Sequence, residues 1–398
     1  MTTTAERTPK FAALVLVTGV SPLATDTYIA ALPDVQRSLS TTASIAQLTL
    51  TAFIIGLALG QLVFGPVSDG RGRRRMLLGG AIAFTAFSAL CAVAPSGPAL
   101  VGLRLLEGLV GGCGVAVGRA VISDRYEGPA AAARYGALAA TTFLGPVLAP
   151  AIGGVILTVG DWRSVFVFLT GIGALMAGGV LLGIPETLPP ERRHPGGLAN
   201  TLARMKDLLR DRAFLSPVVV QCLATAGFFT YIGGSSFVLQ EQLGFSEREY
   251  TVLFASNAAA MVVMSTIFSR TVVRCGAAKL RNAGLFMSTS AAALLLAYSA
   301  VEHPHRPATA LTWVLLALVV AGNGCCIPGT TALAQEAGRR SGGAASALQG
   351  GLTFTVGALA TPLTGLTGHQ TVLVLAVLMT AFYSCAVALL ALSGGWRS

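Results

Sequence analysis

Residues 45–94 read IAQLTLTAFIIGLALGQLVFGPVSDGRGRRRMLLGGAIAFTAFSALCAVA, two apolar stretches joined by a basic loop. Each stretch, 45–67 and 76–94, has about the 20 residues that an α-helix needs to cross the hydrocarbon core of a bilayer. A helix bonds its own backbone groups, as a segment surrounded by lipid must. The loop carries Arg71, Arg73, Arg74 and Arg75. This segment therefore predicts two antiparallel transmembrane helices with a charged turn outside the bilayer.

The same apolar pattern extends over the whole chain. Of its 398 residues, 54% are hydrophobic and 11% are charged, whereas about 25% of the residues of a soluble domain are charged. We expect an all-α integral membrane protein with twelve transmembrane helices in two pseudo-symmetric six-helix bundles. The expected spans are residues 11–32, 45–67, 76–94, 98–122, 135–158, 163–184, 214–239, 250–269, 280–301, 308–333, 343–366 and 370–393.

A polar interruption at residues 185–213 divides these spans into two sets of six. It separates an expected N-terminal bundle, 1–184, from an expected C-terminal bundle, 214–398. Within it, Leu202, Met205 and Leu209 recur at helical spacing, so we expect an amphipathic linker helix on the cytoplasmic membrane surface. Two such halves are typical of transporters built from internal repeats.

Most of the 27 lysines and arginines fall in loops on the side of the membrane that holds the N-terminus. Because positive charge accumulates on the cytoplasmic side, we place both termini in the cytoplasm and the protein in the plasma or inner membrane. The net charge of +10 follows from this orientation, and no inner loop is large enough to form a nucleic-acid-binding domain. The seven cysteines show no CxxC spacing, so we expect neither disulfides, nor a metal site, nor a cofactor.

The sequence contains no GxxxxGK[ST] phosphate-binding motif, and none of its three lysines follows a glycine. We therefore expect no nucleotide site, and any transport against a gradient must be driven by an ion gradient. A membrane enzyme would need clustered histidines or carboxylates at membrane depth, and a channel would need symmetry or a filter motif. Neither pattern is present, which favours a secondary transporter that is not an enzyme.

Few ionisable residues fall inside the expected spans, where such residues are costly and usually functional. Asp26 lies in the first span, and Arg104, Glu107 and Arg119 lie in the fourth. With a rise of 1.5 Å per residue, Asp26 and Arg104 both lie roughly 10 Å below the outer surface, so antiparallel helices would set this acid against this arginine. Glu107 is an alternative partner, three residues from Arg104 on the same helix face. Burial raises the pKa of a carboxylate and a nearby arginine lowers it, so Asp26, Glu107 and Arg104 are candidates for proton coupling, with a structural ion pair as the alternative.

Five motifs resemble the major facilitator superfamily, and within it the twelve-span drug:proton antiporters of the bicyclomycin/chloramphenicol resistance (Bcr/CflA-like) group. Three resemble superfamily and antiporter motifs: GPVSDGRGRRRMLL (65–78), RLLEGLVGGCGVAVGRAVISDRY (104–126) and GPVLAPAIGG (145–154). Two are similar to stretches that mark the drug-exporting group: TDTYIAALPDVQ (25–36) and FFTYIGGSSFVLQEQLGFS (228–246). The resemblance implies a proton-coupled exporter of small, mostly apolar drugs or antibiotics that works by alternating access.

The first motif implies a latch on the cytoplasmic side, made by Gly65, Asp69, Arg71, Arg73 and Asp124. Gly65 lets its helix approach another closely, and Asp69 suits the positive N-terminal end of a helix, which the resemblance places in the span at 343–366. Arg73 is expected to pair with Asp124. The sequence departs from the family pattern at Gly70, where a basic residue is usual, and at Arg75, where proline is common. A solvated basic loop is the alternative interpretation.

The antiporter motif implies a hinge in the fifth span, formed by Gly145, Pro146, Pro150, Gly153 and Gly154. The two prolines remove backbone donors, which favours a kink. The resemblance to the family also implies that this segment forms a tight seal against proton leak. The alternative is that glycine and proline are simply tolerated, since both are common in membrane helices.

The resemblance also implies substrate-binding residues, for which helix packing is the alternative role: Tyr28, Arg119, Phe228, Tyr231 and Asn257. The expected partners are a small-molecule drug, protons and the lipid bilayer, with no nucleic acid and no nucleotide, and the protein is expected to be a monomer. Two other functions stay open, a nutrient or metabolite importer and a self-resistance exporter of an endogenous antibiotic. Spans after residue 213 contain no charge apart from loop-edge residues such as Glu241, which argues against the importer.

Overall fold

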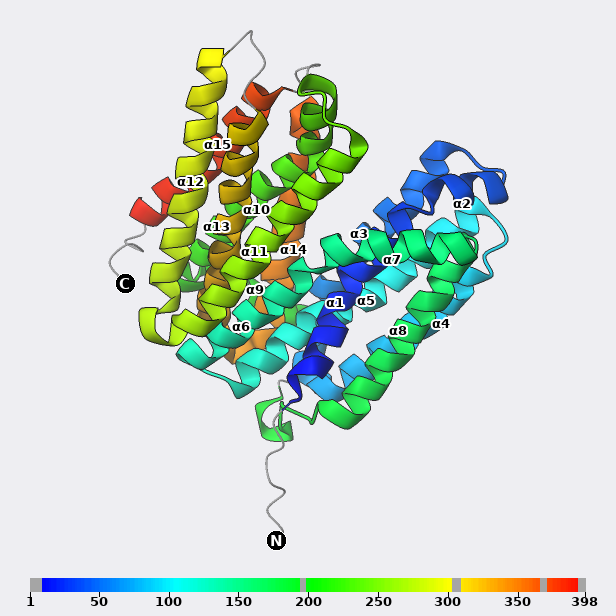
Figure 1. Cartoon of the computed structure of the whole chain (residues 1–398). Helices are drawn as coiled ribbons and strands as arrows, with labels where there is room; N and C mark the ends of the chain where they lie inside the picture. The colour runs from blue at the N-terminus through cyan, green and yellow to red at the C-terminus, as the bar shows by residue number, and fades with distance from the viewer. Residues whose placement is uncertain (1–8, 194–197, 303–308, 366–370, 393–398) are drawn as a thin grey trace. The chain divides into compact units, whose positions relative to one another are not determined.

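The computed structural model describes residues 9–193, 198–302, 309–365 and 371–392, and every regular element in these ranges is helical (Figure 1). Ten helices in the described ranges are long and apolar enough to cross a membrane. The predicted all-α integral membrane fold class is therefore confirmed. Three of the 27 lysines and arginines on which the predicted orientation in the membrane rests lie outside the described residues: Arg7, Arg306 and Arg397.

Two predicted spans are built differently from the other ten. The span expected at 135–158 is two helices, α6 (Gly128–Phe143) and α7 (Gly145–Val159), separated at Leu144. Pro146 has no N–H to donate to the carbonyl of Thr142 four residues earlier, so the helical ladder is interrupted at this point. The span expected at 343–366 is α14 (Gly342–Ala360) followed by a short 3-10 helix, η4 (Thr361–Gly365).

The chain forms two compact units, and unit 1 comprises Met1–Tyr126, Gly145–Asp207 and Gly338–Gly351. Besides α7 and the first half of α14, this unit contains the short 3-10 helices η1 (Pro190–Arg192) and η3 (Arg339–Ser341). Its remaining helices are α1 (Phe11–Ile29), α2 (Leu32–Ser38), α3 (Ala43–Arg71), α4 (Arg73–Ala92), α5 (Gly97–Arg125) and α8 (Trp162–Gly183).

Unit 2 comprises Glu127–Leu144, Leu208–Ala337 and Leu352–Ser398. The unit boundary in the linker falls inside α9 (Leu198–Arg210). Besides α6, the end of α14 and η4, unit 2 contains α10 (Arg212–Phe237), the π-helix η2 (Val238–Gln242), α11 (Glu247–Cys275), α12 (Ala277–Glu302), α13 (Thr309–Ala337) and α15 (Val372–Leu392). Within it, α12 packs against α13 and α15 (Figure 1).

Close packing in unit 1 depends on glycines where α3 meets α5. A Cβ atom on Gly60 would clash with the carbonyl oxygen of Leu109, and one on Gly108 would clash with that of Phe53. Lipid tails are as apolar as the helix surfaces, so helices in membranes gain stability from backbone approach and close contact, which small residues allow. These glycines therefore bring the fourth expected span, with its ionisable residues, against the second.

The two units repeat one structural plan. Both α3 and α11 have 29 residues and are followed by a single glycine, Gly72 with φ 92° and Gly276 with φ 83°, before the next helix begins. Both α5 and α13 also have 29 residues, and their penultimate residues are the acids Asp124 and Glu336. Two sequence-distant segments with the same lengths, the same left-handed glycine and an acid at the same place indicate an internal repeat.

Candidate functional site

A tight turn places the residues of the first motif at one end of unit 1. Helix α3 ends at Arg71, Gly72 adopts a φ of 92°, and α4 begins at once with Arg73. This φ lies in the left-handed region, which glycine adopts without steric cost. The turn directs Arg73 back toward the last turn of α3, where Asp69 precedes it by four residues.

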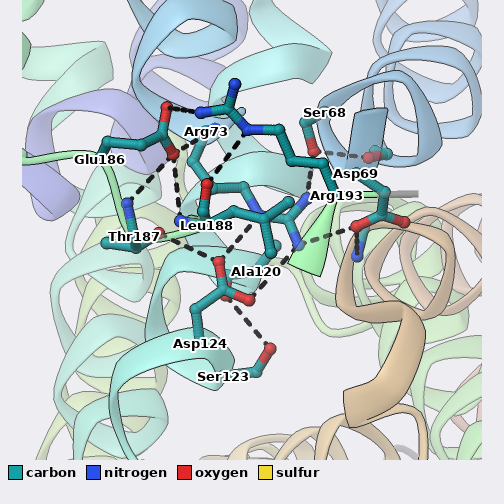
Figure 2. Close-up of polar contacts among 12 residues, drawn as sticks. Ser68, Asp69, Arg73, Ala120, Ser123, Asp124, Glu186, Thr187, Leu188 and Arg193 are labelled. Carbon is teal, nitrogen blue, oxygen red and sulfur yellow. Dashed lines mark hydrogen bonds and ion pairs between the residues drawn. The ribbon is translucent and has the colours of Figure 1, made fainter. Parts of the chain in front are cut away.

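Arg73 is the centre of a buried ionic cluster (Figure 2). Its side chain is 1% exposed; its Nη2 lies 2.8 Å from Asp69 Oδ1, and its Nε lies 2.9 Å from Asp124 Oδ2. Its Nη1 also donates to the Ser68 hydroxyl. One guanidinium thus bridges carboxylates from two helices, and removing one partner of such a buried pair typically costs about 3–5 kcal/mol.

Asp69 also holds the first turn of α14. Its Oδ1 accepts from the Gly343 N–H at 3.0 Å and its Oδ2 accepts from the Ala344 N–H at 3.1 Å. The first N–H groups of a helix have no partner inside the helix, and the N-terminal end of the helix carries partial positive charge. A carboxylate there accepts the free N–H groups and interacts favourably with the positive charge. A Cβ on Gly65 would clash with the carbonyl oxygen of Gly343, so only glycine permits this approach.

The structure therefore brings together Gly65, Asp69, Arg73 and Asp124, together with the start of the span at 343–366. The expected contact of Arg73 with Asp124 and the expected placement of Asp69 at a helix N-terminus are both observed. Arg71 is different, because its side chain is exposed and, among the described residues, it forms no ion pair with Asp69 or Asp124. Arg73 is the cation that pairs with both Asp69 and Asp124.

A second buried network surrounds Arg104 in the middle of unit 1. Arg104 Nη1 lies 2.7 Å from Glu107 Oε2, and both side chains are 0% exposed. The Ser88 hydroxyl donates to Glu107 Oε1 at 2.7 Å, and Arg104 Nη2 donates to the Ala24 carbonyl at 3.1 Å. The guanidinium also lies over the ring of Phe53, 4.2 Å from its centroid, an arrangement favoured by cation–π attraction.

The expected facing of Asp26 and Arg104 is not what the structure shows. Among the described residues, Arg104 forms its ion pair with Glu107, the alternative partner, and none joins it to Asp26. Arg104 does reach the Ala24 carbonyl, two residues from Asp26, but a similar level along two helices does not fix the direction in which a residue points around its helix. On α1 the buried side chains include Ala24 and Tyr28, whereas Asp26 is half-buried, about 200° around the helix from Ala24.

The proposed hinge residues fall where the chain passes from unit 2 to unit 1, between Leu144 and Gly145. Cβ atoms on Gly145 and Gly153 would clash with Pro22 and with the Thr27 carbonyl oxygen, so α7 lies tightly against α1 at two points. Gly154 has open space around it. The side chains of Pro146 and Pro150 lie outside the described residues.

The predicted substrate residues divide between the units. Tyr28 is fully buried in unit 1, with its hydroxyl 2.7 Å from that of Thr49, and Arg119 lies half-buried on α5. In unit 2, Asn257 Nδ2 donates to the Tyr231 hydroxyl at 2.9 Å, and the half-buried Phe228 ring stacks on Tyr231 with centroids 6.3 Å apart. The structure thus brings Phe228, Tyr231 and Asn257 into one cluster.

Comparison with known proteins gives the family. Residues 14–362 match the family model described as Major Facilitator Superfamily. The chain belongs to the major facilitator superfamily. It is 32% identical over 349 residues to the uncharacterized MFS-type transporter YdgK of Bacillus subtilis (strain 168), an alignment that covers 87% of this chain and 86% of that one. It is 28% identical over 281 residues to the multidrug resistance protein MdtL of Salmonella heidelberg (strain SL476), covering 70% of each.

Solved structures of other major facilitator proteins share the fold. The transporter FucP in the outward conformation superposes with a TM-score of 0.77 at 13% identity, covering 96% of this chain and 98% of that one. The human organic anion transporter MFSD10 (TETRAN) gives a TM-score of 0.68 at 16% identity, covering 94% and 98%. At this identity the likeness concerns the fold alone.

This major facilitator protein adds residues to the ionic cluster that the sequence analysis missed. Glu186 Oε1 accepts from the Arg73 N–H at 2.9 Å and from the Thr187 N–H at 3.1 Å. The Thr187 hydroxyl donates to Asp124 Oδ2 at 3.0 Å, while Arg193 Nη2 lies 3.5 Å from Glu186 Oε2 (Figure 2). The only sequence signal was an acid directly after the sixth span, in Pro185-Glu186-Thr187. The segment after α8 therefore closes over the charged turn.

Proposed function

We propose that this major facilitator protein is a proton-coupled secondary exporter of small, mostly apolar drugs, of the bicyclomycin/chloramphenicol resistance group. In this proposal it lies in the plasma or inner membrane with both termini in the cytoplasm. Support comes from the motifs at 25–36 and 228–246 and from the relatives named multidrug resistance protein MdtL. The excess of arginine in loops on one side supports the orientation.

Asp26 carries the proton-coupling part of the proposal. It is a half-buried carboxylate in the first span, beside the Thr25 hydroxyl, and no ion pair to it is found among the described residues. Glu107 is less suited, because Arg104 and Ser88 hold both of its oxygens inside unit 1. A carboxylate that no cation holds in its charged form is free to gain and lose a proton as its surroundings change.

The proposed cycle uses Asp26 as the group that gains and loses the proton. In the inward-facing state the drug and the proton compete for Asp26, and binding of the drug favours the deprotonated carboxylate. In the outward-facing state a proton replaces the drug and returns with the carrier. The contact of Asp69 with the start of α14 acts as the cytoplasmic latch, closed while the carrier is open to the outside.

The test is transport in vesicles that contain the purified protein and an imposed pH gradient, with radiolabelled chloramphenicol as the probe. The parent is expected to move chloramphenicol against its concentration gradient and to release protons when the drug is added in detergent. Asp26→Asn is expected to fold and to lose both activities. Asp34→Asn is the matched control, since Asp34 accepts from the Trp162 N–H at 3.0 Å, outside the proposed path.

Two outcomes would contradict the proposal. Uphill transport and proton release by Asp26→Asn would make Asp26 structural and would pass the role to Glu107. Downhill transport by the parent that ignores the pH gradient would remove proton coupling altogether, and gradient-driven accumulation in the opposite direction would identify an importer.

A further inference from the structure

A cavity of about 820 Å³ lies within unit 2, at the ends of α10, α12, α13 and α15. This volume is in the range of ligand pockets, about 300–1,000 Å³. Its polar lining comes from Arg212, Ser216, Arg281 and Glu336. The cavity belongs to neither the ionic cluster nor the proton-coupling residues, all of which lie in unit 1.

Positive charge predominates in this cavity. Arg212 is the exposed first residue of α10, and Arg281 is 4% exposed on α12, where its Nε donates to Asn282 Oδ1 at 2.9 Å. The lining contains one acid, the exposed Glu336. Asp211, next to Arg212, uses its carboxylate to cap α10 at the Ala213 N–H. The lining itself thus holds two guanidinium groups and one carboxylate, and guanidinium groups bind anionic oxygens such as those of phosphate by charge-assisted hydrogen bonds.

The remainder of the lining is apolar and continues to the surface of the unit. Leu333 and Leu389 line the cavity, and Leu392, at the end of α15, is 87% exposed. All four helices are candidate membrane spans, so these ends lie where hydrocarbon gives way to headgroups. A ligand with an anionic head and a hydrocarbon tail matches both parts of the lining.

The internal repeat makes Glu336 of α13 the counterpart of Asp124 of α5. In unit 1 the chain after α8 turns back, so that Glu186 bonds the N–H of Arg73 and Thr187 bonds Asp124. Glu336, which occupies on α13 the place of Asp124 on α5, instead lines the cavity. The acid at this place of the repeat thus contacts the following chain in unit 1, at Thr187, and faces a cavity in unit 2.

We propose that this cavity binds an anionic phospholipid of the inner leaflet. The phosphodiester lies near Arg212 and Arg281, and an acyl chain lies along Leu389 and Leu392. Basic pockets between transmembrane helices on the cytoplasmic side are suited to anionic headgroups. The assignment to the inner leaflet rests on the orientation proposed above; the recognition of the lipid does not rest on drug transport.

The experiment measures retention of lipid by the purified full-length protein in detergent, by native mass spectrometry after titration with phosphatidylglycerol or phosphatidylcholine. The parent is expected to retain phosphatidylglycerol in preference. Arg212→Gln is expected to weaken this retention about fivefold, the effect of one basic residue near an anionic surface. Glu336→Gln should strengthen it, because it removes the carboxylate that repels the phosphate. Arg274→Gln, an exposed arginine on α11 outside the lining, is the control and should change nothing.

The proposal is overturned if phosphatidylcholine is retained as well as phosphatidylglycerol, or if Arg212→Gln and Glu336→Gln both leave retention unchanged. Arg281→Gln is informative only if the variant folds, so the two exposed positions decide the result. If inorganic phosphate at millimolar concentration displaces the lipid completely, the site recognises an anion alone and the lipid proposal fails. If a chain ending at Leu392 binds phosphatidylglycerol and the full chain does not, the residues after α15 occupy the cavity instead.

Discussion

Replacement of Asp69 by asparagine is expected to release the first turn of α14 from α3. The carboxylate accepts the N–H groups of Gly343 and Ala344 and also pairs with Arg73 at 2.8 Å. Asparagine keeps one acceptor oxygen and presents an NH₂ group to a donor or to the guanidinium. Arg73 retains Asp124, so its own burial stays compensated.

The magnitude follows from these contacts. Hydrogen bonds to a charged group contribute about 1.5–3 kcal/mol each, against about 1 kcal/mol for a neutral one. Loss of one such bond, weakening of the other and loss of the favourable interaction with the helix end together cost about 2–4 kcal/mol. At 1.4 kcal/mol per factor of ten, the released state becomes about 30- to 700-fold more populated.

Hydrogen–deuterium exchange of the peptide that contains Gly343 and Ala344 measures this directly. Its amides are expected to exchange faster by the same factor, with reduced export of drug and with normal insertion into the membrane. Asp161→Asn is the matched control, because Asp161 also caps a helix, α8, but is exposed, and its carboxylate contacts Arg163 two residues later, at the N–H and, at 4.0 Å, at the guanidinium. Unchanged exchange in Asp69→Asn, or an equal change in Asp161→Asn, would refute the reasoning.

Substitutions at three further sites test whether the contacts seen in the structure matter for transport or stability. Gly153→Leu is expected to abolish export or cause proton leak, because the leucine side chain would clash with the Thr27 carbonyl. Gly154→Leu faces open space, so this variant should export normally. Equal transport by both variants would exclude a seal at this helix contact. Glu107→Gln should lower the melting temperature, since it leaves Arg104 buried without its ion pair, at a cost of about 3–5 kcal/mol; an unchanged melting temperature would contradict this. Tyr231→Phe removes the hydroxyl that accepts the Asn257 hydrogen bond and should lower stability by about 0.5–1.5 kcal/mol. It should alter drug selectivity only if this cluster binds drug, and a transport assay with several drugs measures this.

The ionic cluster was largely predictable because its residues are carried by one contiguous motif and by the end of one helix. Arg73 rather than Arg71 makes the contacts because a glycine turn reverses the chain between them, and the Arg71 side chain is left exposed, away from the cluster. Glu186 and Thr187 were missed because loop residues acquire partners only when the whole unit folds. A pattern of local spacing contains no information about such contacts.

The Arg104 network shows the opposite limit. Apolar length predicts a similar level for Asp26 and Arg104 on their helices, but the direction of a side chain around its helix depends on which neighbours pack there. The i,i+3 spacing of Arg104 and Glu107 is a local relation, and it is the one that the structure realises. The glycines of α7 behave similarly, since Gly153 and Gly154 are adjacent and only packing against α1 distinguishes them.

The membership of residues 338–351 in unit 1 has a consequence for biosynthesis. When the ribosome has finished Asp207, the chain contains the ion-pair residues Asp69, Arg73 and Asp124 but not yet the N–H groups of Gly343 and Ala344. At about 5–20 residues per second, on the order of ten seconds of translation separate the two events. Until α14 emerges, the Asp69 carboxylate has its ion-pair partner Arg73 but lacks the two N–H groups that complete its contacts in unit 1.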